Sequence, residues 1–228
     1  MSAAGPRFRA VLLDLDGTLL DTAPDMAGAL NALRQEESLP PLDYAPVRAQ
    51  VSHGSLAVVR LGFPGAEAGE FERLRQRFLA IYATRLARET RLFPGFDVVL
   101  DALERHGIHW GIVTNKPGFL TEPLLAALGL LDRAACVLSG DSLPERKPHP
   151  MPLLVAAERA GVRPTDCIFV GDALRDIQAA RAAGMLPLIA RFGYLGPEDD
   201  PDSWQAAGSI DAPDELLGWL LPAATATA

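Results

Sequence analysis

The chain has 228 residues, 49% of them hydrophobic, which is enough for one domain with a sizeable core, or for one domain carrying a smaller insert. Its formal charge of −8 argues against nucleic acid or an anionic membrane as a principal partner, because such partners need clustered Lys and Arg. The N-terminal residues Met1–Arg9 lack the apolar stretch of a signal peptide, and no later apolar run approaches the length of a spanning helix. These features predict a soluble, cytoplasmic protein.

The segment that follows the first apolar run carries two acids. Ala10–Leu13 is short and apolar, as is typical of a buried strand, and Asp14 and Asp16 come directly after it. Residues two apart in an extended segment point to the same side, and Gly17 allows the backbone to turn tightly. The pair suits a nucleophile beside a general acid/base, although Asp-rich turns also simply cap helices or end strands.

The region from about Thr22 to Phe93 contains no convincing strand. It holds three helical stretches, Pro24–Gln35, Ser55–Leu61 and Phe71–Arg88. We therefore predict a helical cap domain, residues 22–93, inserted into a catalytic core formed by residues 1–21 and 94–228.

The rest of the chain alternates between short apolar runs and helical patterns. This alternation predicts an α/β fold, in which a parallel sheet is joined by right-handed crossovers. The predicted strands are Arg9–Leu13, His109–Val113, Ala135–Ser139, Cys167–Val170 and Leu186–Ala190. The predicted helices are Asp97–His106, Thr121–Leu128, Pro150–Ala160 and Leu174–Ala183. The small residues of Pro222–Ala228 predict a frayed tail.

Polar side chains follow several of the predicted strands. Thr114 and Asn115 come after one strand, Asp172 follows another with Asp176 close behind, and Lys147 lies in the loop before a helix. Each has a plain alternative as a turn residue, a solvated charge or a helix cap. Because ligands of an open parallel sheet bind outside the carboxyl ends of its strands, we expect these groups to form one site.

The types of group in this set suit phosphoryl transfer. Asp14 and Asp172 offer hard oxygen ligands for Mg²⁺. Lys147, Thr114 and Asn115 offer donors for phosphoryl oxygens, together with backbone N–H groups of the turn after the first strand. A carboxylate can then attack phosphorus, while the second acid of the first pair protonates the leaving oxygen and afterwards activates water.

Four segments resemble, in order and spacing, the motifs of the haloacid dehalogenase-like hydrolase superfamily. They are Asp14-Leu15-Asp16-Gly17-Thr18, Val113-Thr114-Asn115, Lys147-Pro148 and Gly171-Asp172-Ala173-Leu174-Arg175-Asp176. The resemblance covers nearly the whole chain. It implies a Rossmann-like core with a helical C1 cap, Mg²⁺ as cofactor, and a small phosphorylated metabolite as substrate.

The resemblance also implies roles for single residues. Asp14 is implied as the nucleophile and a metal ligand, and Asp16 as the general acid/base that also coordinates Mg²⁺ through its backbone carbonyl. Asp172 is implied as a metal ligand, and Asp176 as a group in the metal's outer shell. The implied phosphate-binding residues are Thr114 and Lys147, with Asn115 beside them. The presence of Asp16 favours phosphoryl chemistry over carbon–halogen cleavage.

Within the superfamily the chain is most similar to the phosphoglycolate phosphatase group, and the run Arg191-Phe192-Gly193-Tyr194 is particularly similar to N-acetylmuramic acid 6-phosphate phosphatases. The implied substrate is therefore 2-phosphoglycolate or N-acetylmuramate 6-phosphate. In the cap, Ser52, His53 and Gly54 are the predicted contacts to the leaving group, where a glycine permits close approach. His53 stands where a small residue is expected, and a solvated loop histidine is the plain alternative.

Two other activities fit the same residues. A sugar phosphomutase of the same superfamily would return the phosphoryl group to its sugar. A phosphoaspartate-binding or metal-binding regulatory module would show no turnover. Asp16 weighs against the second alternative, because such a module needs no acid/base beside its phosphorylated aspartate.

Overall fold

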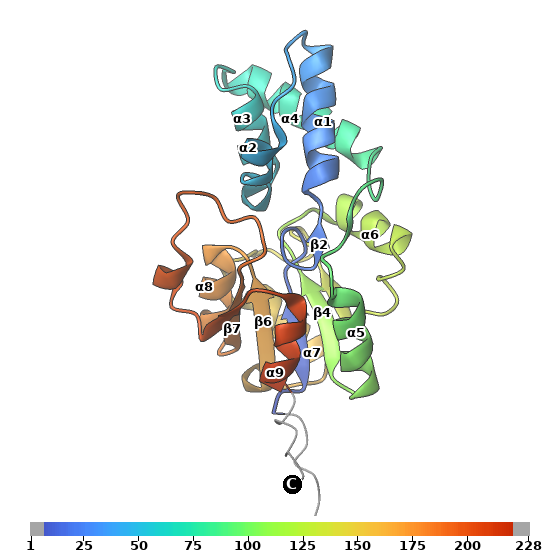
Figure 1. The fold of residues 1–228 in the computed structure, drawn as a ribbon, viewed down its shortest axis with the longest axis vertical. Helices are drawn as coiled ribbons and strands as arrows, with labels where there is room; N and C mark the ends of the chain where they lie inside the picture. Colours follow the sequence, from blue (N-terminus) through green and yellow to red (C-terminus); the bar gives the residue numbers. More distant parts are fainter. Residues whose placement is uncertain (1–6, 221–228) are drawn as a thin grey trace, which may run out of the picture.

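The computed structural model describes residues 7–220, in which a sheet with flanking helices lies below a group of helices (Figure 1). The predicted tail Pro222–Ala228 lies outside these residues. Six parallel strands form the sheet in the order β5-β4-β1-β6-β7-β8. They are β1 (Ala10–Leu13), β4 (His109–Val113), β5 (Cys136–Leu138), β6 (Cys167–Gly171), β7 (Leu186–Ala190) and β8 (Gly208–Ile210). The α/β prediction is confirmed, and each predicted strand is present, whereas β8 was not predicted.

β1 is the central strand and separates two apolar cores. Leu13 lies opposite Ile112 of β4 and Val170 of β6, so β1 is hydrogen-bonded on both sides. Val11 and Leu13 face one core, and Leu12 faces the other, as the alternation of a strand requires. Because both faces of the sheet are covered, every residue of β1 is apolar.

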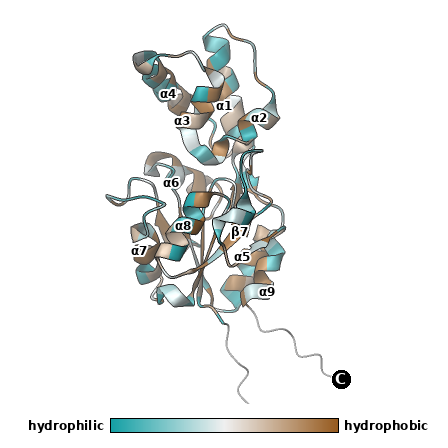
Figure 2. Ribbon diagram, turned by 90° about the vertical axis from the view of Figure 1, so that its left-hand side faces the viewer, coloured by the Kyte–Doolittle hydropathy of each residue, from teal (hydrophilic) through white to brown (hydrophobic). Residues whose placement is uncertain are grey.

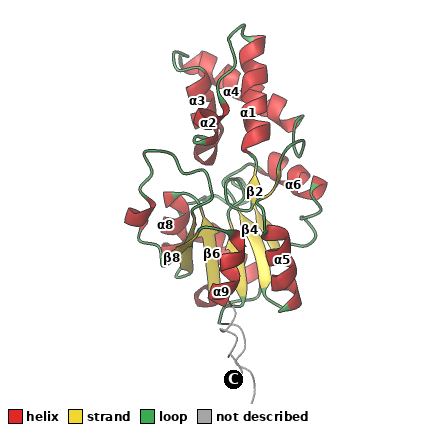
Figure 3. Ribbon diagram, viewed as in Figure 1, coloured by secondary structure: helices red, strands yellow, loops and turns green. Residues whose placement is uncertain are grey.

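Helices cover both faces of the sheet (Figure 3). One core is closed by α5 (Phe96–Arg105), α6 (Gly118–Ala127) and α9 (Leu216–Leu220), and the other by α7 (Met151–Arg159) and α8 (Leu174–Ala182). Short 3₁₀ turns lie at η2 (Pro164–Asp166), η3 (Pro201–Trp204) and η4 (Pro213–Glu215). The helix predicted at Thr121–Leu128 begins earlier, at Gly118, and α9 was not predicted.

The cap consists of helices that pack on one another above the sheet, as the side view in Figure 2 shows. They are α1 (Ala23–Glu36), α2 (Tyr44–Arg48), η1 (Val51–His53), α3 (Gly54–Gly62) and α4 (Ala68–Ala83). The predicted extension of the last helix to Arg88 is wrong, since Ala87 has a positive φ of 60° that no helix accommodates. None of the helices within residues 7–220 is long and apolar enough to cross a membrane.

Two short strands join the cap to the core. β2 (Leu20–Asp21) and β3 (Arg91–Leu92) pair antiparallel, so the expectation of no strand between Thr22 and Phe93 is wrong at its C-terminal end. The buried Asp25 carboxylate accepts hydrogen bonds from the Thr90 N–H at 3.0 Å and the Thr90 hydroxyl at 2.7 Å. This contact fixes the first turn of α1 to the segment that returns to the core.

Candidate active site

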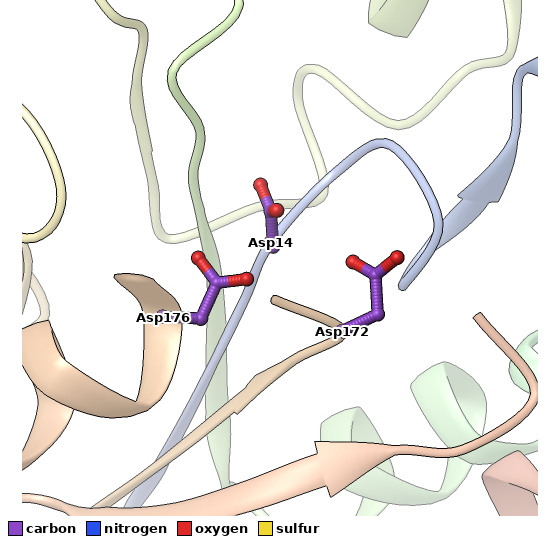
Figure 4. A group of neighbouring side chains, drawn as sticks. All are labelled: Asp14, Asp172 and Asp176. Carbon is purple, nitrogen blue, oxygen red and sulfur yellow. The ribbon is translucent and has the colours of Figure 1, made fainter. Parts of the chain in front are cut away.

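Three buried acids meet at the carboxyl edge of the sheet. β4 and β5 follow β1 on one side of it, and β6 lies on the other side, so the strand order changes direction at β1. Asp14 follows β1, Asp172 follows β6, and Asp176 lies in the first turn of α8 (Figure 4). All three are at most 3% exposed, and each offers one oxygen within 4.8 Å of the others. This set, hereafter the acid triad, is consistent with a metal site.

Lys147 lies in direct contact with the acid triad. Its side chain is fully buried, and Nζ lies 2.8 Å from Asp14 Oδ1 and 2.9 Å from Asp176 Oδ1. Nζ also donates a hydrogen bond of 2.7 Å to the Val113 carbonyl at the end of β4. Asn115 holds the loop in place, because its amide donates to the Lys147 carbonyl at 2.8 Å and accepts from the Lys147 N–H at 3.1 Å.

The charges of the acid triad exceed what Lys147 balances. Burial, and then the neighbouring acids, raise the pKa of Asp172 to about 7. Its carboxylate accepts hydrogen bonds from the Thr18 hydroxyl at 3.1 Å, the Ser52 hydroxyl at 2.6 Å and the Tyr194 N–H at 2.9 Å. Carboxylate oxygens that repel one another in a buried site fit a hard divalent cation, which is the ligand set that Mg²⁺ favours.

Gly17 brings the backbone against the acid triad. Its φ is +84°, and a Cβ atom there would lie 2.1 Å from Asp172 Oδ2, so no other residue fits without displacement. The N–H groups of this turn are partly used already: Leu15 N–H donates to Asp14 Oδ1 at 2.7 Å, and Gly17 N–H donates to the Leu20 carbonyl at 3.0 Å. Two of the backbone N–H groups that were predicted to bind phosphate, those of Leu15 and Gly17, therefore already have partners in this structure.

The Asp16 side chain is not part of the acid triad and lies next to the cap connection. Its Oδ1 accepts hydrogen bonds from the Thr22 hydroxyl at 2.7 Å and from Lys116 Nζ at 2.9 Å. Lys116 Nζ also donates to the Tyr82 hydroxyl at 2.9 Å. Lys116 was not among the site residues predicted from the sequence, although it directly follows Thr114-Asn115. Metal coordination by the Asp16 backbone carbonyl stays a prediction.

A cavity of about 440 Å³ lies between core and cap and brings most of the predicted residues together. The predicted core residues in its lining are Asp14, Asp16, Thr114, Asn115 and Lys147, and Lys116 joins them. The predicted cap residues Ser52, His53 and Gly54 also line it. Its apolar wall consists mainly of Met26, Leu56, Phe78, Leu79 and Leu120.

The three predicted cap residues have different surroundings. The Ser52 hydroxyl donates to Asp172, and the Ser52 carbonyl accepts a hydrogen bond from Arg175, so this residue contacts the core. His53 is exposed at the cavity wall. Gly54 has a φ of +81°, and a Cβ atom there would meet nothing within 4 Å, so glycine is favoured by the turn into α3 rather than by a close approach.

Arg48 also holds the cap against the core. Its guanidinium lies 4.8 Å from the centre of the Tyr194 ring and donates to the carbonyls of Phe192 at 3.1 Å and Gly193 at 3.0 Å. The Tyr194 hydroxyl donates to Asp21 of β2 at 2.7 Å. Together with Ser52, these contacts describe a cap that is closed on the core.

Comparisons with known proteins find relatives over most of the chain. A model of the haloacid dehalogenase-like hydrolases matches residues 8–184. A phosphoglycolate phosphatase of Xanthomonas campestris pv. campestris is 50% identical over 208 residues, which cover 91% of this chain and 94% of that protein. An N-acetylmuramic acid 6-phosphate phosphatase of Pseudomonas aeruginosa is 42% identical over 215 residues, covering 94% and 95%. The solved structure of a protein described as a predicted phosphoglycolate phosphatase from Haemophilus somnus superposes with a TM-score of 0.83 at 30% identity, covering 93% and 97%.

Proposed function

Because the chain belongs to the haloacid dehalogenase-like hydrolase family, we propose that it hydrolyses a small organic phosphomonoester through an aspartyl-phosphate on Asp14. It is a phosphatase of the type that includes phosphoglycolate phosphatases and N-acetylmuramic acid 6-phosphate phosphatases. One observation supports the proposal most strongly. Asp14 lies in the floor of the cavity with its Oδ1 held by Lys147 Nζ at 2.8 Å and by the Leu15 N–H at 2.7 Å.

These two donors orient the Asp14 carboxylate as a nucleophile. A carboxylate whose rotamer is fixed by two partners loses little freedom when it attacks, which is the advantage of a preorganised group. Lys147 and Thr114 line the same cavity. The three N–H groups of Lys147 Nζ are directed to Asp14, Asp176 and the Val113 carbonyl, so a bound phosphoryl oxygen has to replace one of these contacts. Attack of Asp14 forms the carboxylate–phosphorus bond as the bond to the leaving oxygen breaks.

In this proposal Asp14, the Asp16 backbone carbonyl and Asp172 would hold Mg²⁺, and Asp176 would support them from beside the site. When bound, the cation neutralises charge on the acids and on the phosphoryl oxygens. Asp176 has structural partners of its own, since it accepts a hydrogen bond of 3.0 Å from the Ala173 N–H at the start of α8 and contacts Lys147. It therefore fixes the position of Lys147 in addition to adding charge to the acid triad.

Asp16 is the proposed acid and base. It gives its proton to the leaving oxygen in the first step, and takes a proton from the water that attacks phosphorus in the second. The second step breaks the bond between Asp14 and phosphorus and releases inorganic phosphate. The cap segment that starts at Val51 and α4 line the cavity on the cap side, and the proposed role of cap closure is to limit the access of bulk water during these steps.

The cavity favours a leaving group larger than glycolate. At about 440 Å³ it falls within the range of roughly 300–1,000 Å³ that holds drug-sized ligands. Its lining combines Arg75, Arg146 and Arg175 with apolar side chains, and the apolar part suits the sugar ring and acyl groups of N-acetylmuramate better than a two-carbon acid. We therefore propose N-acetylmuramate 6-phosphate as the preferred substrate, with 2-phosphoglycolate as the second candidate.

Two assays test this function. Release of phosphate from p-nitrophenyl phosphate should require Mg²⁺, and no release by the wild-type protein under any metal condition would exclude the phosphatase. The ratio of kcat/KM for N-acetylmuramate 6-phosphate to that for 2-phosphoglycolate, at one Mg²⁺ concentration, should be greater than one. A mutase would instead convert one sugar phosphate isomer into another with little free phosphate.

A further inference from the structure

Lys116 is a buried cation whose contacts do not belong to the acid triad. Its side chain is 4% exposed, and its ammonium lies between two partners from distant parts of the chain. One partner is Asp16 Oδ1 at 2.9 Å, at the end of the first strand region. The other is the Tyr82 hydroxyl at 2.9 Å, near the end of α4 in the cap. A core acid and a cap hydroxyl are thus joined through one ammonium group.

We propose that Lys116 is a positioning residue for Asp16, and that Tyr82 completes this positioning only when the cap is closed. This inference rests on the proposed function, in which Asp16 protonates the leaving oxygen. Lys116 then acts through Asp16 and not on the phosphoryl group. Closure of the cap then brings Tyr82 to Lys116 and so completes the orientation of the Asp16 carboxylate.

The distribution of contacts on the Asp16 carboxylate supports this. Oδ1 accepts both the Thr22 hydroxyl at 2.7 Å and the Lys116 ammonium at 2.9 Å. Oδ2 accepts no hydrogen bond from any group within residues 7–220, and Asp16 lines the cavity. Two donors on one oxygen fix the rotamer of the carboxylate and leave the other oxygen for the proton transfer.

Tyr82 is held rigidly enough to make the contact depend on the position of the whole cap. Its ring is buried and lies parallel to that of Phe78, with the ring centroids 6.2 Å apart. Lys116 Nζ lies 4.6 Å from the centre of the Tyr82 ring, so the ammonium contacts both the ring and its hydroxyl. Movement of α4 away from the core therefore removes both contacts at once and leaves the ammonium with Asp16 alone.

The dependence of rate on the leaving group separates this role from a structural one. An alkoxide needs a proton as it departs, whereas p-nitrophenolate leaves well without one. Substitution of a residue that acts through the general acid should therefore lower kcat/KM for alkyl phosphates, and should lower it much less for p-nitrophenyl phosphate. A residue that merely stabilises the fold, or binds phosphate, should affect both substrates alike.

The experiment compares kcat/KM at saturating Mg²⁺ for p-nitrophenyl phosphate and for N-acetylmuramate 6-phosphate or 2-phosphoglycolate, whichever the wild type turns over faster. The variants are Lys116→Met, Lys116→Arg and Tyr82→Phe. Asp16→Asn is the reference, and should lose about 10²–10⁴-fold on the alkyl phosphate and far less on the aryl phosphate. Tyr44→Phe, which removes a cap hydroxyl from an exposed tyrosine outside the cavity, is the matched control.

Lys116→Met should lose about tenfold more on the alkyl than on the aryl phosphate, a fraction of the full general-acid effect. Lys116→Arg should recover part of that difference, and Tyr82→Phe, which keeps the ring, should show a difference of about threefold. Equal losses on both substrates in the Lys116 and Tyr82 variants would overturn the inference. If Asp16→Asn itself shows no dependence on the leaving group, the proposed function fails first, and the two failures are thereby distinguished.

Should Lys116→Met fail to fold, as judged by circular dichroism and thermal unfolding, Lys116→Arg and Tyr82→Phe decide the matter alone. Both keep the volume of the native side chain, and Tyr82→Phe removes one oxygen. An unchanged ratio between the two substrates in both variants would then contradict the inference.

Discussion

The floor of the cavity, formed by the core, and its roof, formed by the cap, differ in the kind of side chain that each presents. The floor, at the carboxyl ends of β1 and β4, carries buried charged groups such as Asp14 and Lys147. Lys147 also contacts Asp176, which lies outside the cavity lining. The roof, formed by the cap, contributes apolar side chains such as Phe78 and Leu79 together with polar residues, among them Ser52, His53 and Arg75. Charged groups held by fixed partners are positioned for a single reaction. Side chains in the cavity wall instead select substrates by the shape of the leaving group. The difference suggests that the floor determines the chemistry and the roof determines the substrate and the moment of reaction.

The strongest test of the floor is Asp14→Asn. The change preserves shape but removes the nucleophile, so turnover of every phosphomonoester should fall below detection. Phosphate release measures the effect, and circular dichroism should report an unchanged fold. Near wild-type turnover by this variant would show that no aspartyl-phosphate forms on Asp14.

The next effect is that of Lys147→Ala. Loss of a charge-assisted contact costs about 1.5–3 kcal/mol, which predicts a loss in affinity for phosphate of about 10–150-fold. The removal also leaves Asp14 and Asp176 without their shared cation, so Mg²⁺ should stabilise this variant against heat more than it stabilises the wild type. Inhibition by inorganic phosphate and thermal unfolding measure the two parts, and unchanged inhibition would contradict the assignment.

A smaller effect concerns pH and the metal. Burial, then Asp14 and Asp176, raise the pKa of Asp172 from 3.8 to about 7 in the metal-free protein. An acid whose folded-state pKa is raised holds its proton in the fold, so metal-free stability should fall as pH rises from about 4 to 7. Mg²⁺ needs the charged form, so its affinity should increase over the upper part of this range and level off above it. Calorimetric titration at several pH values measures this, and an affinity independent of pH between 6 and 8 would count against it.

The smallest effect belongs to the roof. His53→Ala enlarges the exposed wall of the cavity without touching a charged partner of the floor, so we expect it to change the preference between N-acetylmuramate 6-phosphate and 2-phosphoglycolate. Changes of this size in a pocket are worth about 1–3 kcal/mol in discrimination. The ratio of the two kcat/KM values is the measurement. A preference identical to that of the wild type would make His53 a solvated loop residue.

The sequence predicted the floor better than the roof for a physical reason. Asp14, Thr114 and Asp172 each follow a buried strand directly, so a local pattern predicts both the strand and the position of the polar group. The contact of Lys116 with Tyr82 joins residues that are 34 apart, and no period in the sequence signals such a pair. The closeness of Asp176 to Asp14 depends on how α8 packs on the sheet, which is a matter of tertiary structure.

The elements that were missed are short. β2 and β3 have two residues each and β8 has three, too few to show an alternating pattern. The five-residue α2 has only one fully buried side chain, Val47, so its helical period is invisible. The end of α4 at Ala83 depends on the turn through Ala87, whose positive φ its alanine side chain does not signal.

The pairing of β2 with β3 bears on how such an enzyme can change its substrate in evolution. Leu20 lies opposite Leu92 and Asp21 opposite Arg91, so the chain leaves the core and returns to it at one place. An insertion whose two ends already touch can be lengthened, shortened or exchanged without altering the register of the main sheet. The covalent connection between cap and core is thus confined to a ladder of two residue pairs, outside the main sheet.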